Sequence, residues 1–307
     1  APDDAAGENG ADDAAAGDAP PGPHPSLRPL RGDGSHPYHY IDNIVVLQME
    51  NRSFDHYLGA LSLVEGRRDV DGLRADHGNV DAFGNNVLVR HLAEEYNIDP
   101  DPGHGHNSCL RQFAEGTNGG FVLDWERLLD ESNRAERLDW VMGYHVREQL
   151  PTMYGLADAF TVCDRWFCSL LGPTWPNRFY SHAATSEGNW SNRTPLQQAP
   201  PYTWLPDGKR FGFYHQSMVH FGITLTGLPR GFPHFDLPKF FEDAAQGTLP
   251  NVCFVEPFYG LNDDHPPVDL RLGQAFIHSV YEALRTSPQW DRTLFLVFYD
   301  EHGGFYD

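Results

Sequence analysis

Three short apolar runs limit how this chain can fold. They are NIVVLQM at residues 43–49, NVCFV at 251–255 and TLFLVFY at 293–299. Each run is rich in β-branched and aromatic residues and is hydrophobic almost without interruption, which is typical of strands buried on both faces of a parallel sheet. We therefore expect an α/β fold, with a central and mostly parallel sheet flanked by helices.

A helical pattern precedes the third run. In GQAFIHSVYEALRTSPQW, residues 273–290, apolar side chains recur at helical spacing until Pro288 ends the pattern. The apolar positions are Phe276, Ile277, Val280, Tyr281 and Leu284. A helix that leads directly into a buried strand forms half of a crossover connection, which agrees with a parallel sheet.

The remaining regions divide the chain into a leader and one domain. Residues 1–38 are rich in Ala, Asp, Gly and Pro, so they bury too little apolar surface to fold, and we expect a disordered acidic leader before a domain at 39–307. Residues 190–250 are rich in Pro, Trp and Tyr with weak periodicity, which predicts a loop-rich insertion over the site. The chain stops a few residues after the third run, so we expect a domain truncated at its C-terminus.

Each apolar run ends in an acidic side chain. Glu50 and Asn51 follow the first run, Glu256 the second, and Asp300 and Glu301 the third. Ligands collect at the carboxyl ends of strands in open α/β sheets, so these residues mark a candidate site. Carboxylates within about 4 Å repel by roughly 4 kcal/mol per pair at an effective dielectric near 20, and a divalent cation removes that cost. An all-oxygen ligand set suits Ca²⁺, Mg²⁺ or Mn²⁺ better than zinc. The alternative is that these are solvated loop acids.

The charge balance excludes several partners. Lys and Arg number 22 against 43 Asp and Glu, a formal net charge of -21. Such a surface repels nucleic acid and anionic lipid headgroups, so a function on phosphate requires a local positive centre. The alternative explanation is salt tolerance or a GC-rich genome. No apolar run approaches the roughly 20 residues of a membrane-spanning helix.

The stretch LLGPTWPNRFYSH, residues 170–182, predicts a helix start beside the site. Thr174 follows Gly-Pro and resembles the N-cap of the helix. Capping the helix is the structural role that Thr174 could have instead of a catalytic one. A helix dipole supplies at most about 2 kcal/mol, too little to activate a hydroxyl, whereas a metal ion can lower the pKa of bound water from about 15.7 to about 7. Thr174 is thus a candidate nucleophile only if it reaches the ion. Asn177 and Arg178 are candidate phosphate contacts, with Arg178 suited to bidentate geometry.

Histidines complete the candidate site. His104 in DPGHGHN and His265 in NDDHPP lie in Gly/Pro-rich turns beside acids, where a loop histidine can meet substrate. The alternative is a surface or structural role. His302 directly follows Asp300 and Glu301, so chain geometry alone keeps it near the cluster. HExxH, P-loop, GxGxxG and GxSxG motifs are absent, and the four cysteines form no CxxC pair.

Several motifs carry a resemblance to a known family. They are ENRSFDHYLG, DPGHG, MGYH with LPTMYGLADAFTVCDRWF, GPTWPNR, and NDDHPP with the terminal TLFLVFYDEHGGFYD. In this order they resemble the bacterial phosphoesterase family of phosphatidylcholine-type phospholipases C and related acid phosphatases. The resemblance runs from about Ile41 to the last residue. It implies an alkaline-phosphatase-like α/β fold. Family members continue well past the DEHGG motif.

The resemblance also implies roles for individual residues. Glu50, Asn51, Asp300 and Glu301 match the family's metal ligands, Thr174 the nucleophile, and His104 and His265 active-site histidines. Threonine at the nucleophile position resembles phospholipases C, whereas serine is typical of the acid phosphatase branch. The expected function is therefore a metal-dependent phospholipase C that forms a phosphothreonine intermediate. The alternatives are a broad acid phosphatase acting on monoesters and a non-catalytic exported protein that retains the fold.

The expected cofactor is one divalent cation held by hard oxygen ligands, Ca²⁺ before Mg²⁺ or Mn²⁺, with Thr174 as a further ligand. The expected partner is a phosphoester, a phospholipid or its headgroup, with transient contact to a membrane surface. No nucleic acid and no stable protein partner is expected. The resemblance favours a secreted, periplasmic or cell-surface protein.

Overall fold

A single parallel sheet forms the centre of the molecule. The computed structural model describes residues 40–193, 205–216 and 233–307. Within them the sheet has the strand order β7-β6-β8-β1-β9, and every pairing is parallel. The strands are β1 Asn43–Met49, β6 Phe211–His215, β7 His234–Asp236, β8 Val252–Val255 and β9 Thr293–Tyr299. The predicted α/β fold with a mostly parallel sheet is therefore confirmed.

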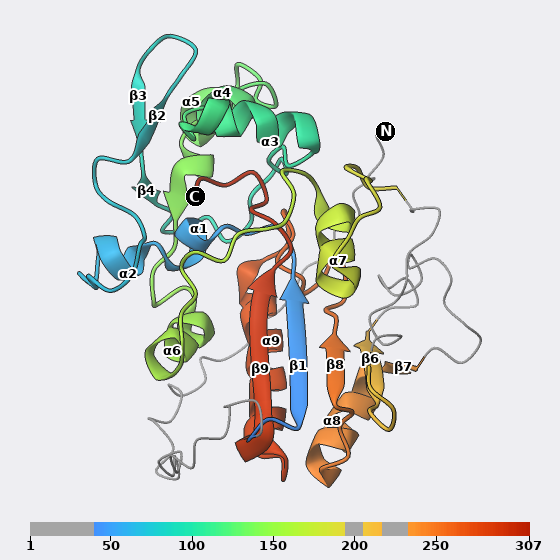
Figure 1. Ribbon diagram of the computed structural model, residues 1–307. Coiled ribbons are helices and arrows are strands. Elements are labelled where there is room, and N and C mark those ends of the chain that lie inside the picture. The colour runs from blue at the N-terminus through green and yellow to red at the C-terminus, as the bar shows by residue number, and fades with distance from the viewer. Residues whose placement is uncertain (1–39, 194–204, 217–232) are drawn as a thin grey trace.

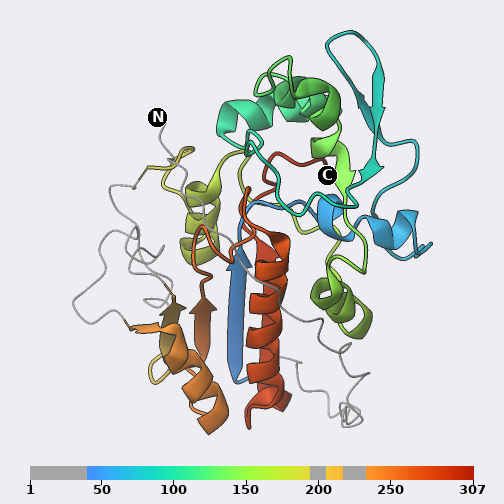
Figure 2. The same cartoon turned by 180° about the vertical axis from the view of Figure 1, so that it is seen from behind.

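Helices cover both faces of this sheet. The helices α8 (Leu237–Gln246) and α9 (Leu270–Arg285) lie on one face, and α7 (Thr174–Ala183) lies on the other, beside the carboxyl end of the sheet (Figures 1 and 2). The connection from β8 through α9 to β9 passes over β1, which lies between those two strands. This is the crossover unit that parallel neighbours require.

The main core lies between the sheet and α8 with α9. Val45, Leu47 and Met49 of β1 are fully buried in the same cluster as Phe240 of α8 and Ile277 of α9. The cluster on the opposite face contains Val46, Phe211, Phe213 and Phe254. Successive strand residues point to opposite faces, so a strand covered on both sides is apolar at most positions. This explains the continuous hydrophobic run at 43–49.

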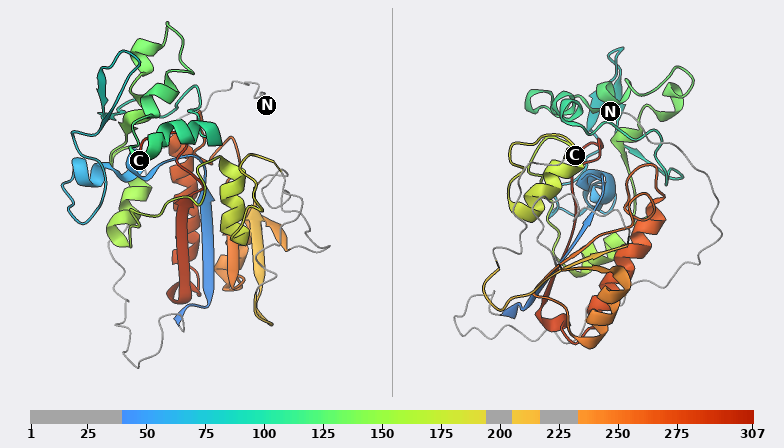
Figure 3. Two further views of the ribbon diagram at one scale, coloured as in Figure 1. Left: turned by 45° about the horizontal axis from the view of Figure 1, so that its top comes forward. Right: turned by 90° about the vertical axis from the view of Figure 1, so that its right-hand side faces the viewer.

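The smaller elements gather over the carboxyl edge of the sheet (Figure 3). They are α1 Phe54–Leu58, α2 Ala60–Leu63, β2 Gly78–Val80, β3 Asn86–Leu88, β4 Arg90–His91, α3 His106–Phe113, η2 Ala114–Gly116, α4 Phe121–Trp125, α5 Arg134–Arg137, η3 Trp140–Met142 and β5 Gly143–Tyr144. Two others, α6 Pro151–Ala159 and the 3₁₀ turn η6 Trp290–Arg292, pack beside or below the sheet. Among the described residues, no helix is long and apolar enough to cross a bilayer.

Most predicted elements are found, and the middle of the chain differs. The three apolar runs form β1, β8 and β9, and the helical pattern forms α9, which begins at Leu270 and ends at Arg285, before Pro288. The described part of 190–250 contains β6, β7 and α8, which the weak periodicity did not predict. The expected leader at 1–38 lies outside the described residues.

Candidate functional site

The strand ends bring four carboxylates to one edge of the sheet. Because β1 lies between β8 and β9, the residues that follow these strands are neighbours, although they are far apart in the sequence. Glu50, Glu256, Asp300 and Glu301 each expose 5% or less of their surface. Their burial rules out the alternative that they are solvated loop acids. Buried carboxylates require a compensating cation or hydrogen bonds.

Asn51 and Glu301 leave oxygen atoms without a hydrogen bond. The backbone N–H groups of Asn51 and Glu301 both donate to Oδ1 of Asp300, at 3.0 and 2.9 Å. Oδ1 of Asn51 and Oε1 of Glu301 are buried and have no hydrogen-bond partner among the described residues. A buried oxygen without a donor is costly, and amide and carboxylate oxygens are the ligands that hard cations prefer. These residues therefore fit the divalent cation that the sequence predicts.

Glycine allows the turn after β9 to approach Asn51. Gly303 has a φ of 64°, and a Cβ there would lie 2.1 Å from the carbonyl oxygen of Asn51. Gly304 has a φ of 77°, and its Cβ would lie 2.6 Å from the carbonyl oxygen of Gly103. The two glycines let this turn contact both the end of β1 and the loop that carries His104. This close approach brings three distant segments to one site.

Arg178 supplies a buried positive charge to the carboxylates. Its side chain is fully buried, forms an ion pair with Glu50, and donates from Nε to Oδ2 of Asp300 at 3.2 Å. Nη2 also donates to the carbonyl oxygen of Met49 at 3.0 Å, and Nη1 lies 3.9 Å from Glu256. The guanidinium thus joins α7 to the ends of three strands. The sequence predicted that Arg178 contacts phosphate. These distances instead place its guanidinium against carboxylates, and the phosphate contact stays a prediction.

Thr174 begins α7 without capping it. The N-cap is Pro173, and no side-chain hydrogen bond caps the helix, so the predicted N-cap role of Thr174 is wrong. Proline lacks an N–H but its extended conformation still allows the helix to start at the next residue. Thr174 is buried, and it lies four positions before Arg178, on the same face of the helix. Thr174 therefore lies on the side of α7 that faces the carboxylates.

Asn177 and His302 are held by other parts of the protein. Nδ2 of Asn177 donates to the carbonyl oxygens of Leu170, Gly172 and Pro173, so this side chain fixes the turn before Thr174. The ring nitrogens of His302 lie 3.0 Å from Oε2 of Glu301 and 2.8 Å from Oε1 of Gln112. The polar atoms of both side chains therefore already have partners within the protein. The contact of Asn177 and His302 with phosphate, expected from the sequence, stays a prediction.

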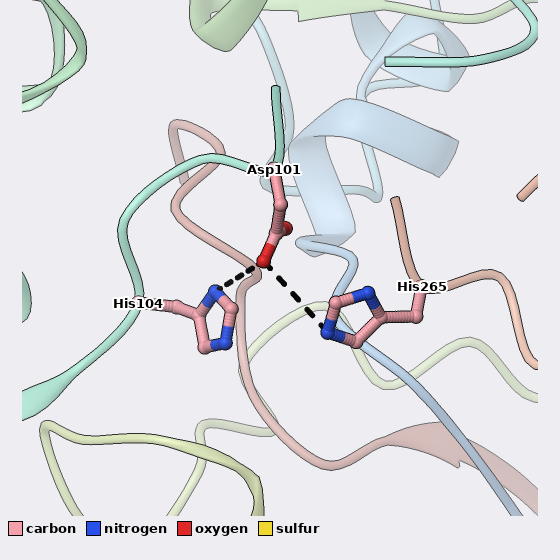
Figure 4. Close-up of side chains that lie close together, drawn as sticks. All are labelled: Asp101, His104 and His265. Carbon is pink, nitrogen blue, oxygen red and sulfur yellow. Dashed lines mark ion pairs between the residues drawn. The ribbon is translucent and has the colours of Figure 1, made fainter. Parts of the chain in front are cut away.

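His104 and His265 come together around Asp101 (Figure 4). Oδ2 of Asp101 lies 3.6 Å from Nδ1 of His104 and 3.8 Å from Nε2 of His265. These three ligand-type atoms lie within 4.8 Å of one another, close enough that a metal ion could be considered there. Asp101 is not among the site residues predicted from the sequence. Its place three residues before His104, in the DPGHG turn, was the available signal.

The acidic surroundings shift the titration of this site. Burial favours the neutral form of His104, but Glu301 and Asp101 outweigh it and raise the pKa of His104 to about 9. Burial also opposes ionisation of Glu301, but His104 and His302 lower its pKa overall. For Glu50, burial dominates over the attraction of Arg178, and its pKa is raised well above the usual value. The site accordingly favours additional positive charge.

Together these features define a class: an α/β protein with an oxygen-rich candidate cation site at the carboxyl edge of a parallel sheet. A model of the Phosphoesterase family matches residues 41–307. The chain therefore belongs to the phosphoesterase family, as the motifs indicated.

Named relatives include phospholipases C from plants and bacteria. The chain is 39% identical over 289 residues to "Non-specific phospholipase C1" of Arabidopsis thaliana, an alignment covering 87% of this chain and 53% of the relative. It is 36% identical over 298 residues to "Non-specific phospholipase C3" of the same plant, covering 87% and 56%. It is 30% identical over 338 residues to "Phospholipase C B" of Mycobacterium tuberculosis, covering 92% and 63%. The chain thus spans little more than half the length of these relatives.

Proposed function

We propose that this protein is a metal-dependent phosphoesterase of the phospholipase C type, which hydrolyses phosphodiester headgroups. The observation that carries this proposal is the set of buried strand-end carboxylates with the unpartnered oxygens of Asn51 and Glu301. Membership of the phosphoesterase family and the phospholipase C names of the relatives support it. The cation required to balance the carboxylates is also the positive centre that an acidic protein needs to bind phosphate.

The proposed ligands are Glu50, Asn51, Asp300, Glu301 and the hydroxyl of Thr174. All are oxygen donors, which favours Ca²⁺, with Mg²⁺ or Mn²⁺ as alternatives. Such an ion, when bound, polarises phosphate oxygens and lowers the pKa of a coordinated hydroxyl. We assign Arg178 the role of holding Glu50 and Asp300 in place, because its guanidinium already pairs with both.

Thr174 is the proposed nucleophile, and its phosphorylated form is the proposed intermediate. Oγ1 of Thr174 forms a bond to phosphorus and releases its proton to water, while the bond to the leaving alcohol breaks. A ring N–H of His265 or His104 gives its proton to the leaving oxygen. Water then attacks phosphorus and returns a proton to that histidine. The bond to Thr174 breaks, and its oxygen takes up a proton.

The substrate class can be tested with two chromogenic esters. Turnover of nitrophenyl phosphorylcholine by the purified protein with Ca²⁺ or Mn²⁺ should exceed turnover of nitrophenyl phosphate, and Thr174→Ala should abolish both. A strong preference for the monoester would instead assign the protein as an acid phosphatase with the same site. Absence of turnover with either ester, unchanged by Thr174→Ala, would assign a non-catalytic protein that retains the fold.

The covalent step has a separate test. Acid quenching of the reaction followed by peptide mass spectrometry should find phosphate on Thr174, and the Thr174→Ala variant provides the control. If substrate turns over without a phosphorylated Thr174, water attacks directly and the covalent mechanism is wrong. Because the proposed substrate is a phospholipid, brief contact with a lipid surface outside the cytoplasm is part of this proposal, and co-sedimentation with phosphatidylcholine vesicles tests it.

A further inference from the structure

We propose that Asp101 is a positioning residue, whose carboxylate sets the relative orientation of His104 and His265; this inference rests on the proposed function. The two histidines lie on separate loops, one before α3 and one between β8 and α9. Asp101 is the carboxylate between them, with Oδ2 at 3.6 Å from one ring and 3.8 Å from the other (Figure 4). The rings are nearly perpendicular, at 85°, with centroids 5.7 Å apart.

Backbone carbonyl groups determine which nitrogens face the site. Nδ1 of His104 lies 2.9 Å from the carbonyl oxygen of Pro102, and Nδ1 of His265 lies 2.6 Å from that of Pro266. A carbonyl oxygen accepts a hydrogen bond, so both Nδ1 atoms carry a proton. The Nε2 atoms are therefore the nitrogens that can exchange a proton with substrate. Nε2 of His104 lies beside Nδ2 of Asn51 at 3.2 Å, and Nε2 of His265 faces Asp101.

One hydrogen bond to a carbonyl group does not fix a ring. A histidine held only through Nδ1 can still tilt about that bond, and Nε2, on the far side of the ring, then moves most. The Asp101 carboxylate lies at ion-pair distance from Nε2 of His265, whose ring is otherwise held through Nδ1. It lies at a similar distance from Nδ1 of His104, whose Nε2 is also 3.2 Å from Nδ2 of Asn51, so one carboxylate acts on both rings. Oδ1 of Asp101 is itself buried and has no hydrogen-bond partner among the described residues. The other oxygen, Oδ2, is the one that faces both histidines.

The same three side chains also have the spacing of a metal site. A metal ion bound by Oδ2 of Asp101 together with Nδ1 of His104, the ring nitrogen 3.6 Å from that oxygen, would need Nδ1 without its proton. The lone pair of Nδ1 would then lie 2.9 Å from the carbonyl oxygen of Pro102, with no hydrogen between two acceptors. That arrangement is unfavourable unless the carbonyl is also a ligand. With a proton on each Nδ1, the two carbonyl contacts are hydrogen bonds and Asp101 faces both rings at ion-pair distance.

The decisive experiment compares Asp101→Asn with the matched control Asp99→Asn, on an exposed side chain of the same loop. Each variant is assayed as the full chain on two phosphodiesters, one with a nitrophenol leaving group and one with an alkyl alcohol. A nitrophenolate leaves with little protonation, whereas an alkoxide requires an aligned acid, whose contribution is about 10²- to 10⁴-fold. We expect Asp101→Asn to lower kcat by about 100-fold for the alkyl ester and by less than about 5-fold for the nitrophenyl ester, with KM nearly unchanged.

Equal losses on both esters, or no loss relative to Asp99→Asn, would overturn the positioning role. The number of metal ions bound per chain, measured on the purified proteins, is a second test that distinguishes a metal ligand from a positioning residue. If Asp101→Asn binds one ion fewer per chain than the wild type, Asp101 is a metal ligand and the inference is wrong. An unchanged metal content supports positioning.

A crystal structure of Asp101→Asn tests the positioning role of Asp101 without an activity measurement. A rotation of the His104 or His265 ring away from its original position supports the inference, and rings that stay in place overturn it. Absence of turnover by the wild type on either ester would count against the proposed function, while the comparison of ring positions would still decide the role of Asp101.

Discussion

Arg178 on α7 donates a hydrogen bond from Nε to Oδ2 of Asp300 at 3.2 Å, although 122 positions separate the two residues. The same guanidinium pairs with Glu50, so one cation connects the helix of Thr174 to the ends of β1 and β9. A buried carboxylate pair held by one arginine is stable only while that arginine is present. The relationship therefore links the stability of the protein to the geometry of its candidate site.

Replacing Arg178 should destabilise the whole protein. Arg178→Met keeps the length of the side chain but leaves Glu50 and Asp300 buried without their cation, and removal of one partner from a buried ion pair costs about 3–5 kcal/mol. Denaturant unfolding measures this change. Arg285→Met is the matched control, because the pair of Arg285 with Glu282 is partly exposed and should be worth about 1 kcal/mol or less. Equal losses in the two variants would contradict the role assigned to Arg178.

Thr174→Ala should lose activity without losing stability. Thr174 makes no capping hydrogen bond, so removal of its hydroxyl should change the free energy of unfolding by less than about 0.5 kcal/mol. Ser53→Ala is the comparison, because Ser53 accepts a hydrogen bond from the N–H of His56 at the start of α1 and its loss should cost about 1 kcal/mol. Thr174→Ser should retain turnover, since the hydroxyl is kept. A loss of stability in Thr174→Ala equal to that in Ser53→Ala would show that Thr174 caps α7 after all.

A methyl group at Gly303 should disrupt the site. Alanine is strained at a φ of 64°, and its Cβ would also clash with the carbonyl oxygen of Asn51. Gly84→Ala controls for the backbone strain alone, because Gly84 has a φ of 82° and open space around it. We expect a loss of about 1 kcal/mol for Gly84→Ala and a clearly larger loss for Gly303→Ala. Calcium titration by calorimetry should show weakened binding only in Gly303→Ala; equal binding in both variants would count against a site at Asn51.

The sequence predicted the strands that border the site because burial on both faces leaves a direct trace. β1, β8 and β9 read as continuous apolar runs, and the polar residue after each run marked the edge of the sheet. β6 has the sequence FGFYH, in which Gly and His interrupt the apolar pattern, and β7 has only three residues. These two strands are recognisable only through the pairing of β6 with β8 and of β7 with β6, which sequence periodicity does not record.

The sequence also identified the acidic ligand candidates but not the partners of the basic ones. Glu50 and Asp300 follow buried strands, so their position required only the strand prediction. Arg178 lies on α7, and its spacing of four residues from Thr174 indicated that both lie on one face of the helix. The spacing did not indicate which residues that face contacts. The guanidinium meets carboxylates because β1 and β9 end beneath α7, a relationship set by tertiary packing. The pairing of Asp101 with two histidines depends in the same way on loops from opposite ends of the domain.

Buried neutral histidine should make the protein sensitive to acid. Burial is the main reason that the pKa of His182 falls to about 3, with the positive charge of Arg178 adding to it, and its ring packs 4.2 Å from that of Phe254. In unfolded chains the pKa is about 6.5, so between pH 6.5 and 3 the unfolded state binds a proton that the folded state excludes. Stability therefore falls as the pH falls through this window, by about 2 kcal/mol at pH 5 from this residue alone.

His182→Phe should flatten the dependence of unfolding free energy on pH between 7 and 4, measured by urea unfolding at each pH. His278→Phe is the comparison for the change of side chain alone, because His278 is exposed on α9. The slope, rather than the absolute stability, is the readout, since a phenylalanine also changes packing. An identical slope in wild type and His182→Phe would show that His182 binds protons equally in the folded and unfolded states, and the prediction would be wrong.

Removal of divalent cations should lower the melting temperature as well as activity. Glu50, Glu256, Asp300 and Glu301 are all buried at the same edge, where Arg178 and His104 supply positive charge, so a divalent ion should relieve the repulsion that remains among the ionised carboxylates. An ion that binds only the folded state stabilises it by about 2.7 kcal/mol at a free concentration 100 times its Kd. Scanning calorimetry in chelator and after addition of Ca²⁺ measures the difference. In Glu301→Gln, which removes one proposed ligand charge, the shift produced by Ca²⁺ should be smaller. A wild-type melting curve that does not change in chelator would mean that the carboxylates are balanced by Arg178 and protons alone, and the proposed cation site would be wrong.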